Sequence, residues 1–199
     1  MMLVLLVVLG QYAGSSTNEI TGAFGFVLGQ QVISDMALYP SGWNRTTANS
    51  VNWFTNGSGW IYDKRRDRYS LSKPTGDMSF RDITVIADHT GHVFMISAYA
   101  YPWDISAPTA PDLFKTTRNL LAEKYAERQP WHTFSSTDNI PADTVTFGNS
   151  RRSVGLAQYY AVKAVLRLQY RDEQLMTRQL SHEDQMIDPS VRKGLDGKL

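Results

Sequence analysis

The alternation of apolar and polar positions is clearest in the middle of the chain, from Phe80 to Tyr101. Two runs there repeat with a period of two, which is the spacing of side chains along β-strands. Between them Gly91 can adopt the positive φ of a short hairpin loop, and Asp88 can bond its own turn backbone. The sequence therefore predicts a central antiparallel hairpin that is covered on one side and partly on the other. One face of its first strand carries Ile83, Val85 and Ala87.

A helix is predicted over residues 111–128. Pro111 lies in its first turn, and Asp112 follows Thr109 by three residues, as in a capping box. We expect the helix to end near Arg128, because Pro130 cannot continue it. Apolar and small side chains recur at helical spacing and predict one packing face, made of Leu113, Thr117, Leu120, Leu121 and Tyr125.

Other segments are assigned from the same patterns. Strands are predicted over 20–28, 144–147 and 158–170, and the last of these alternates between a buried and a mostly solvated face. Residues 131–143 are polar and predict a loop. Residues 171–186 predict a final helix, whose inner side carries Leu175, Met176, Gln179 and Leu180.

These elements together predict an α+β protein: a mainly antiparallel sheet with one principal helix packed on one face and a C-terminal helix. A length of 199 residues fits one domain. We place this single domain at residues 20–187 and expect residues 188–199 to form a flexible tail.

The first nine residues are wholly apolar, and no charged side chain occurs before Glu19. Such a run is too short to span a bilayer but fits the apolar region of a secretory signal. We therefore predict a signal peptide at residues 1–15, a protein exported to the periplasm or secreted, and no stable membrane span after signal removal. The alternative is a buried first strand.

Composition narrows the classes of function. Apolar residues make up 42% and aromatic residues 12% of the chain, which excludes a disordered protein. The net charge of +1 gives no overall field for nucleic acid, so no nucleic-acid partner is expected. Cysteine is absent, which excludes disulfides, a thiol nucleophile and a cysteine-ligated zinc.

Residues 41–68 combine aromatic, small polar and basic side chains. Residues 51–54 and 60–62 are predicted to pair as a hairpin across Asn56-Gly57. One interpretation is a surface that binds a glycan or another polymer by ring stacking and hydrogen bonding. The other is cross-strand aromatic packing followed by a solvated charge run. The candidate binding residues are Trp43, Trp53, Trp60, Tyr62, Arg65 and Arg66.

The candidate chemistry is limited to histidines. His89 and His92 flank the hairpin turn beside Asp88, and two imidazoles with a carboxylate are ligands that a metal can use. A turn directs its side chains outward, however, and no further ligand is evident. His132 is followed by several hydroxyl residues, but no Gly-x-Ser-x-Gly nucleophile elbow is present. We assign no catalytic residue, no metal and no cofactor.

The order of several short motifs resembles uncharacterised exported, periplasmic-type α+β proteins of Gram-negative bacteria. The resemblance spans residues 20–172 and implies secretion and an α+β fold, without implying catalytic residues. It lies in Gly22-Ala23-Phe24-Gly25 with Leu28-Gly29, Tyr69 and Pro74 before Phe80, the strand–turn–strand, a helix ending Leu120-Leu121-Ala122-Glu123-Lys124-Tyr125, and Leu168-Gln169-Tyr170-Arg171-Asp172.

The leading functional hypothesis is a non-enzymatic envelope protein that binds a protein or a glycan-type polymer. The alternatives are an envelope-directed hydrolase that uses His132 or the His89/His92 turn, and an immunity or inhibitor protein. The sequence does not define the oligomeric state.

Overall fold

The computed structural model describes residues 19–33, 44–45, 53–55, 59–74, 80, 82–100, 110–125, 127–135, 141–160 and 164–186. Within these ranges ten strands form one sheet in the order β3-β4-β5-β6-β7-β8-β12-β11-β10-β9, and every neighbouring pair is antiparallel. A separate two-stranded sheet joins β1 to β2. The predicted α+β class with a mainly antiparallel sheet is therefore confirmed.

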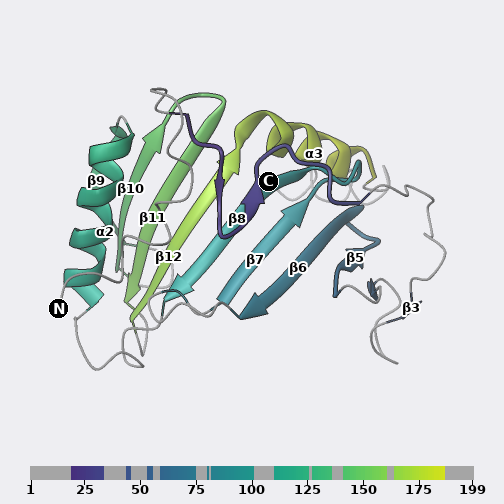
Figure 1. Cartoon of the computed structure of the whole chain (residues 1–199), viewed down its shortest axis with the longest axis horizontal. Coiled ribbons are helices and arrows are strands. Elements are labelled where there is room, and N and C mark those ends of the chain that lie inside the picture. Colours follow the sequence, from purple (N-terminus) through teal and green to yellow (C-terminus); the bar gives the residue numbers. More distant parts are fainter. Residues whose placement is uncertain are drawn as a thin grey trace, which may run out of the picture.

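The strands are β1 (Gly22–Ala23), β2 (Phe26–Val27), β3 (Asn44–Arg45), β4 (Trp53–Thr55), β5 (Ile61–Asp63), β6 (Arg68–Pro74), β7 (Asp82–Ala87), β8 (Val93–Ala100), β9 (Glu127–Ser135), β10 (Pro141–Gly148), β11 (Arg152–Tyr160) and β12 (Ala164–Asp172). The helices are α2 (Ala110–Lys124) and α3 (Glu173–Met186). Figure 1 shows the strands side by side, with α3 along the edge at which β12 ends.

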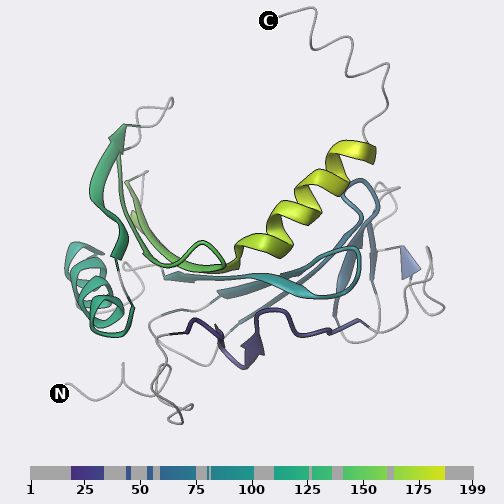
Figure 2. The same ribbon diagram turned by 90° about the horizontal axis from the view of Figure 1, so that it is seen from above.

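The large sheet is curved and has elements on both of its faces. Figure 2 shows α2 and the β1–β2 segment on the outer side of the curve and α3 on the inner side. The helix α2 packs mainly over β11 and also contacts β12 and β10, while α3 contacts β8, β11 and β12. The predicted arrangement of one principal helix on one face and a C-terminal helix is present.

The apolar core lies on the outer face of the sheet. Val85, Ile96 and Leu168 are buried there, under side chains of α2 and of residues 20–33. The predicted packing face of α2 is largely confirmed, because Leu113, Thr117 and Leu121 are buried. Phe114 belongs to this core as well, although the helical pattern did not single it out. The side chains that cover the core from α2 and from residues 20–33 include Ile20, Leu28, Ile33, Leu113, Phe114 and Leu121.

The central hairpin forms as predicted, from β7 and β8. Ile83, Val85 and Ala87 are all buried on one face of β7. The Oδ1 atom of Asp88 accepts hydrogen bonds from the backbone N–H groups of Thr90 and His92, at 2.9 and 3.0 Å. Gly91 has a φ of 79°. The turn is therefore formed by the Asp88 side-chain bonds and the positive φ of Gly91, the two features from which it was predicted.

Two predictions in the second half of the chain are wrong. The single strand predicted over 158–170 is a hairpin, in which β11 and β12 pair from Arg152↔Asp172 to Tyr160↔Ala164. The alternation continues through the connection, and residues 161–163 contain none of the common turn residues. The loop predicted over 131–143 contains most of β9 and the start of β10. An outermost strand tolerates polar side chains and proline, which weakens its pattern.

The remaining differences concern element ends and one side chain. Residues 20–28 form the β1–β2 hairpin instead of one strand, and its turn at Phe24 and Gly25 has φ values of 54° and 81°. The helix α2 stops at Lys124, because the chain enters β9 at Glu127. In α3 the predicted inner residue Gln179 is buried, but Leu180 is 53% exposed. The helix is held by polar contacts near Gln179, and these turn Leu180 outward.

The expected signal peptide at residues 1–15 and the expected tail at 188–199 lie outside the described residues. Within the described ranges, neither helix is both long and apolar enough to cross a bilayer.

Replacing Gly91 by alanine should destabilise the protein by about 3 kcal/mol, which combines the cost of a left-handed φ with a steric clash. A Cβ at this position would collide with the carbonyl oxygen of Ile33. Gly25→Ala is the matched control, because its φ is also positive but a Cβ there would meet open space. Urea unfolding of both variants measures the difference. Equal destabilisation would contradict the clash with Ile33.

Burial raises the pKa of the Tyr170 phenol above its ordinary value, and the nearby Tyr125 adds a smaller contribution in the same direction. The folded state therefore holds this proton at pH values where the unfolded chain releases it. The contribution of this pKa difference to the free energy of unfolding is fully present below about pH 10 and is lost as the pH rises further. We expect the urea midpoint to fall more steeply between pH 9 and about pH 11 in the wild type than in Tyr170→Phe. Identical pH profiles would exclude Tyr170 as a source of this dependence.

Candidate functional site

The predicted aromatic and basic surface is divided by the fold. Trp60 and Tyr62 are only 7% and 4% exposed and belong to the apolar core. The Tyr62 ring packs on the ring of Tyr69 at a centroid distance of 5.1 Å. These two rings are therefore unavailable for stacking on a ligand, which corrects the predicted surface. The interpretation as cross-strand packing describes them better, because they stabilise the β5–β6 pair.

The other four candidate residues have different positions. Arg65 and Arg66 are exposed in the turn between β5 and β6, where the Arg65 N–H donates to Asp63 Oδ1 at 3.0 Å. Trp53 lies in β4, opposite Asp63, and only its backbone is described. Trp43 lies outside the described residues. The predicted hairpin itself is confirmed, with Phe54 paired to Tyr62.

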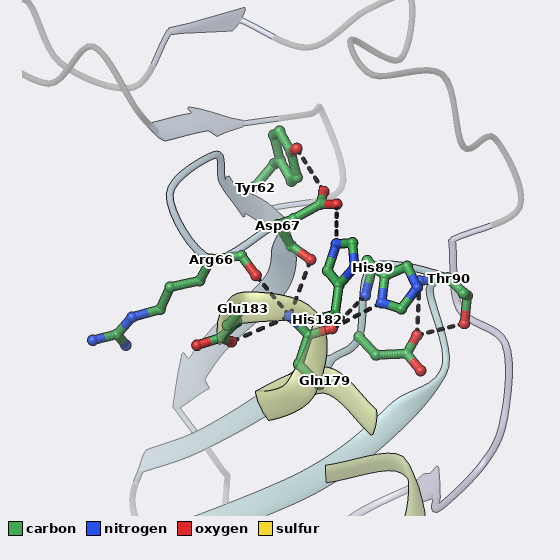
Figure 3. Close-up of polar contacts among 9 residues, drawn as sticks. Tyr62, Arg66, Asp67, His89, Thr90, Gln179, His182 and Glu183 are labelled. Atoms are coloured by element: carbon green, nitrogen blue, oxygen red, sulfur yellow. Dashed lines mark hydrogen bonds and ion pairs between the residues drawn. The ribbon is translucent and has the colours of Figure 1, made fainter. Parts of the chain in front are cut away.

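A polar cluster instead forms where the β5–β6 and β7–β8 turns meet α3. We call it the turn-edge cluster; its residues are Tyr62, Asp67, His89, Gln179 and His182. Figure 3 shows these side chains pointing toward one another. His182 Nε2 lies 2.8 Å from Asp67 Oδ2, and the Tyr62 hydroxyl donates to Asp67 Oδ1 at 2.7 Å. The rings of His89 and His182 are stacked at 4.0 Å, 16° from parallel.

Gln179 connects the helix to both turns. Its Oε1 accepts from the His89 backbone N–H at 2.9 Å and lies 3.1 Å from His89 Nδ1. Its Nε2 donates to the backbone oxygens of Arg66 and Asp67, at 2.6 and 3.2 Å (Figure 3). The side chain is only 1% exposed, so these bonds replace water completely. The cluster therefore anchors α3 to the sheet.

The geometry of the cluster also limits its chemistry. The Thr90 hydroxyl donates to Asp88 Oδ1, so His92 Nδ1, 2.8 Å from that hydroxyl, is the donor in the second bond. Among the described residues no hydroxyl is hydrogen-bonded to His182, so its pairing with Asp67 activates no nucleophile there. The stacked rings of His89 and His182 direct their nitrogens along parallel planes, whereas a metal needs converging ligands.

This geometry bears on the metal site considered at the His89/His92 turn and on a hydrolase that uses His132 or that turn. Within the described part of the chain, no three or more histidine or acidic side chains are arranged to hold a metal ion. His132 lies in β9, paired with Thr144 of β10, and its side chain is not described. The partners of the His132 side chain therefore lie outside the described structure, while among the described residues His89 contacts Gln179 and His182, and His92 contacts Thr90.

The inner face of the sheet carries a second set of polar side chains, which we call the polar sheet face. One row of paired residues crosses six adjacent strands without a large apolar side chain. It consists of Ser72, Thr84, Ser97, Gln169, Gly155 and Thr146, each in register with the next. With strands about 4.8 Å apart, this row is about 24 Å long.

Several of these side chains are fixed by their neighbours. The Ser72 and Thr84 hydroxyls lie 3.3 Å apart, and Gln169 Nε2 donates to Ser97 Oγ at 3.0 Å. Thr84, Gln169 and Thr146 are partly exposed. The face therefore offers hydroxyl and amide groups in set positions, with further hydrogen-bonding capacity toward solvent.

The adjacent row adds one ring and two charges to the polar sheet face, and the ring of Tyr159 lies one row further on. Asp82, Tyr99 and Arg167 are in register across β7, β8 and β12. The Arg167 guanidinium lies over the ring of Tyr159, 5.1 Å from its centroid. Tyr99, Tyr159 and Arg167 are all partly exposed. This row was not predicted, because sequence shows the alternation within one strand but not the register between strands.

Protein-family models, curated proteins and solved structures were compared with the chain, and none of them matches it.

Replacing Gln179 by alanine should lower the free energy of unfolding by about 3 kcal/mol, because it leaves a buried N–H and two carbonyl groups without partners. The control is Gln174→Ala, an exposed position on the same helix with the same helix propensity change. Urea unfolding gives the stability, and amide hydrogen exchange should show faster exchange across α3 in the first variant only. Equal exchange in both variants would contradict the anchoring role.

Proposed function

We propose that this protein is a non-enzymatic binding module of the cell envelope and that its partner is a hydroxyl-rich polymer bound on the polar sheet face. The row from Ser72 to Thr146 is the observation that carries this proposal. It presents hydroxyl and amide groups in fixed register over about 24 Å, a length suited to an extended chain. Hydrogen bonds to such groups and ring contacts with Tyr99 are the interactions that a polysaccharide can make.

The composition of this face favours a polymer over a folded protein partner. Protein interfaces generally have an apolar and aromatic centre that is buried on binding. Here the centre of the face is made of serine, threonine, glutamine and glycine, while most large buried apolar side chains lie on the opposite face; Ile86 and Met95 occupy the next row of the inner face. A solvated polar ligand matches the first surface better, because its own polar groups remain hydrogen-bonded.

The proposal includes export. The apolar run at residues 1–9 supports it, as does the absence of cysteine, since a redox-independent core suits an envelope protein. Mass spectrometry of protein secreted by its natural host should find an N-terminus close to residue 16. Full-length protein retained in the cytosol would contradict export without bearing on the polymer site.

The binding site can be tested with the double variant Thr84→Ala/Gln169→Ala. Losing two hydrogen bonds of about 1 kcal/mol each should weaken polymer binding by roughly 30-fold. Affinity electrophoresis in gels that contain soluble polysaccharides measures the dissociation constant. Lys115→Ala, exposed on α2 at the opposite face, is the matched control and should bind like the wild type.

Three outcomes would count against the proposal. No retardation of the wild-type protein by any of a panel of neutral and acidic polysaccharides would exclude a polymer partner of this kind. Equal weakening by the α2 control would place the binding surface elsewhere. Capture of one envelope protein, lost in the double variant, would replace the polymer by a protein partner.

A further inference from the structure

The strand β12 presents three functional side chains at alternate positions on the polar sheet face. They are Arg167, Gln169 and Arg171, which pair across the sheet with Tyr99, Ser97 and Met95 of β8. Alternate residues of a strand are about 6.6 Å apart and share one face, so the two guanidinium groups flank the amide of Gln169. Positive charge therefore lies on both sides of the row of hydroxyl and amide groups.

The two arginines differ in their partners. Arg171 Nε lies 3.9 Å from Glu173 Oε1 at the start of α3, so a carboxylate of the protein balances its charge. Arg167 contacts the Tyr159 ring, and among the described residues no acidic side chain forms an ion pair with it. A ring contact holds the guanidinium plane without neutralising its charge.

An uncompensated, partly buried guanidinium is a binding group for an anion. Its planar set of N–H donors matches both oxygens of a carboxylate, and such charge-assisted pairs are stronger than neutral hydrogen bonds. Gln169 lies beside it, is partly exposed and can bond a neighbouring hydroxyl group of the same ligand, while the buried Ser97 hydroxyl accepts from the Gln169 amide. The chemistry of this position therefore fits a sugar acid better than a neutral sugar.

The surrounding charges also limit the ligand. Asp82 is exposed in the same row as Arg167 and lies two strands away, at a backbone separation of about 10 Å. A nucleic acid binds mainly through many phosphate contacts to basic residues, whereas Arg167 is one arginine in a row that also holds an exposed carboxylate. The net charge of +1 gives no long-range attraction for such a ligand. A carboxylate with hydroxyl-bearing neighbours is the better match.

We propose that the polymer is an acidic polysaccharide and that Arg167 binds the carboxylate of one of its sugar units. This inference rests on the proposed function. Gln169 and the neighbouring hydroxyl residues bind the sugar hydroxyls on either side.

The test uses one polymer in two charge states: polygalacturonate and its highly methyl-esterified form. Isothermal titration calorimetry of the full-length protein at 50 mM and at 300 mM NaCl should give at least tenfold tighter binding of the acid form at low salt. Arg167→Gln should remove this preference but keep the weak binding of the ester. Arg167→Lys, which keeps the charge but loses the planar donor set, should retain part of it.

Arg178→Gln is the matched control, because Arg178 is an exposed arginine on α3. It should keep the full preference, and circular dichroism melting curves confirm that each variant is folded. Equal wild-type binding of both polymer forms would overturn the acidic ligand and leave the proposed polymer site intact. A preference that survives in Arg167→Gln would overturn the role of Arg167. If neither polygalacturonate nor its methyl ester binds, both this inference and the proposed polymer site are overturned.

Discussion

The pairing of β8 with β12 is the interaction on which the rest of the fold depends. In the described part of the sheet, β3 to β8 pair in chain order and so do β9 to β12, and this one ladder joins the two series. It sets large side chains against small ones, with Leu166 opposite Ala100 and Leu168 opposite Ala98. Such pairs leave room on the outer face for the apolar side chains that cover it.

The same ladder creates the proposed ligand surface on the other face. It brings Ser97 next to Gln169 and Tyr99 next to Arg167, although about 70 residues separate the partners along the chain. A shift of one residue would exchange the two faces of β12 and place its arginines against the core. Stability and the proposed recognition therefore depend on one register. The buried side chains fix it, because only one alignment places the apolar set of β12 under the covering layer.

The sequence predicted the elements whose signals are local. The β7–β8 hairpin follows from alternation and a glycine turn, and α2 follows from helical spacing. The β11–β12 hairpin was missed because its connection lacks turn residues, and β9 was missed because an outer strand tolerates a polar sequence. Whether an alternating run is one long strand or two depends on the turn between them, and alternation alone does not show it.

The sites were harder to predict than the fold. Trp60 and Tyr62 have the composition of a stacking surface, but their strands turn these rings into the core. In the sequence the arginines of β12 resemble an ordinary solvated face, because their proposed role depends on Tyr159, Ser97 and Tyr99 on other strands. The stacking of His89 on His182 likewise joins residues far apart in the chain. One signal was available: Gln179, a polar residue on the predicted inner side of the last helix.

The sheet is curved but open, since β3 at one end and β9 at the other are not paired to each other in the described structure. An open sheet leaves the described part of that inner face accessible along its sides, and α3 lies over part of this inner side (Figure 2). A long molecule can then lie across it and extend beyond the protein in both directions. The proposed polymer would then be recognised at an internal stretch, with no free end required.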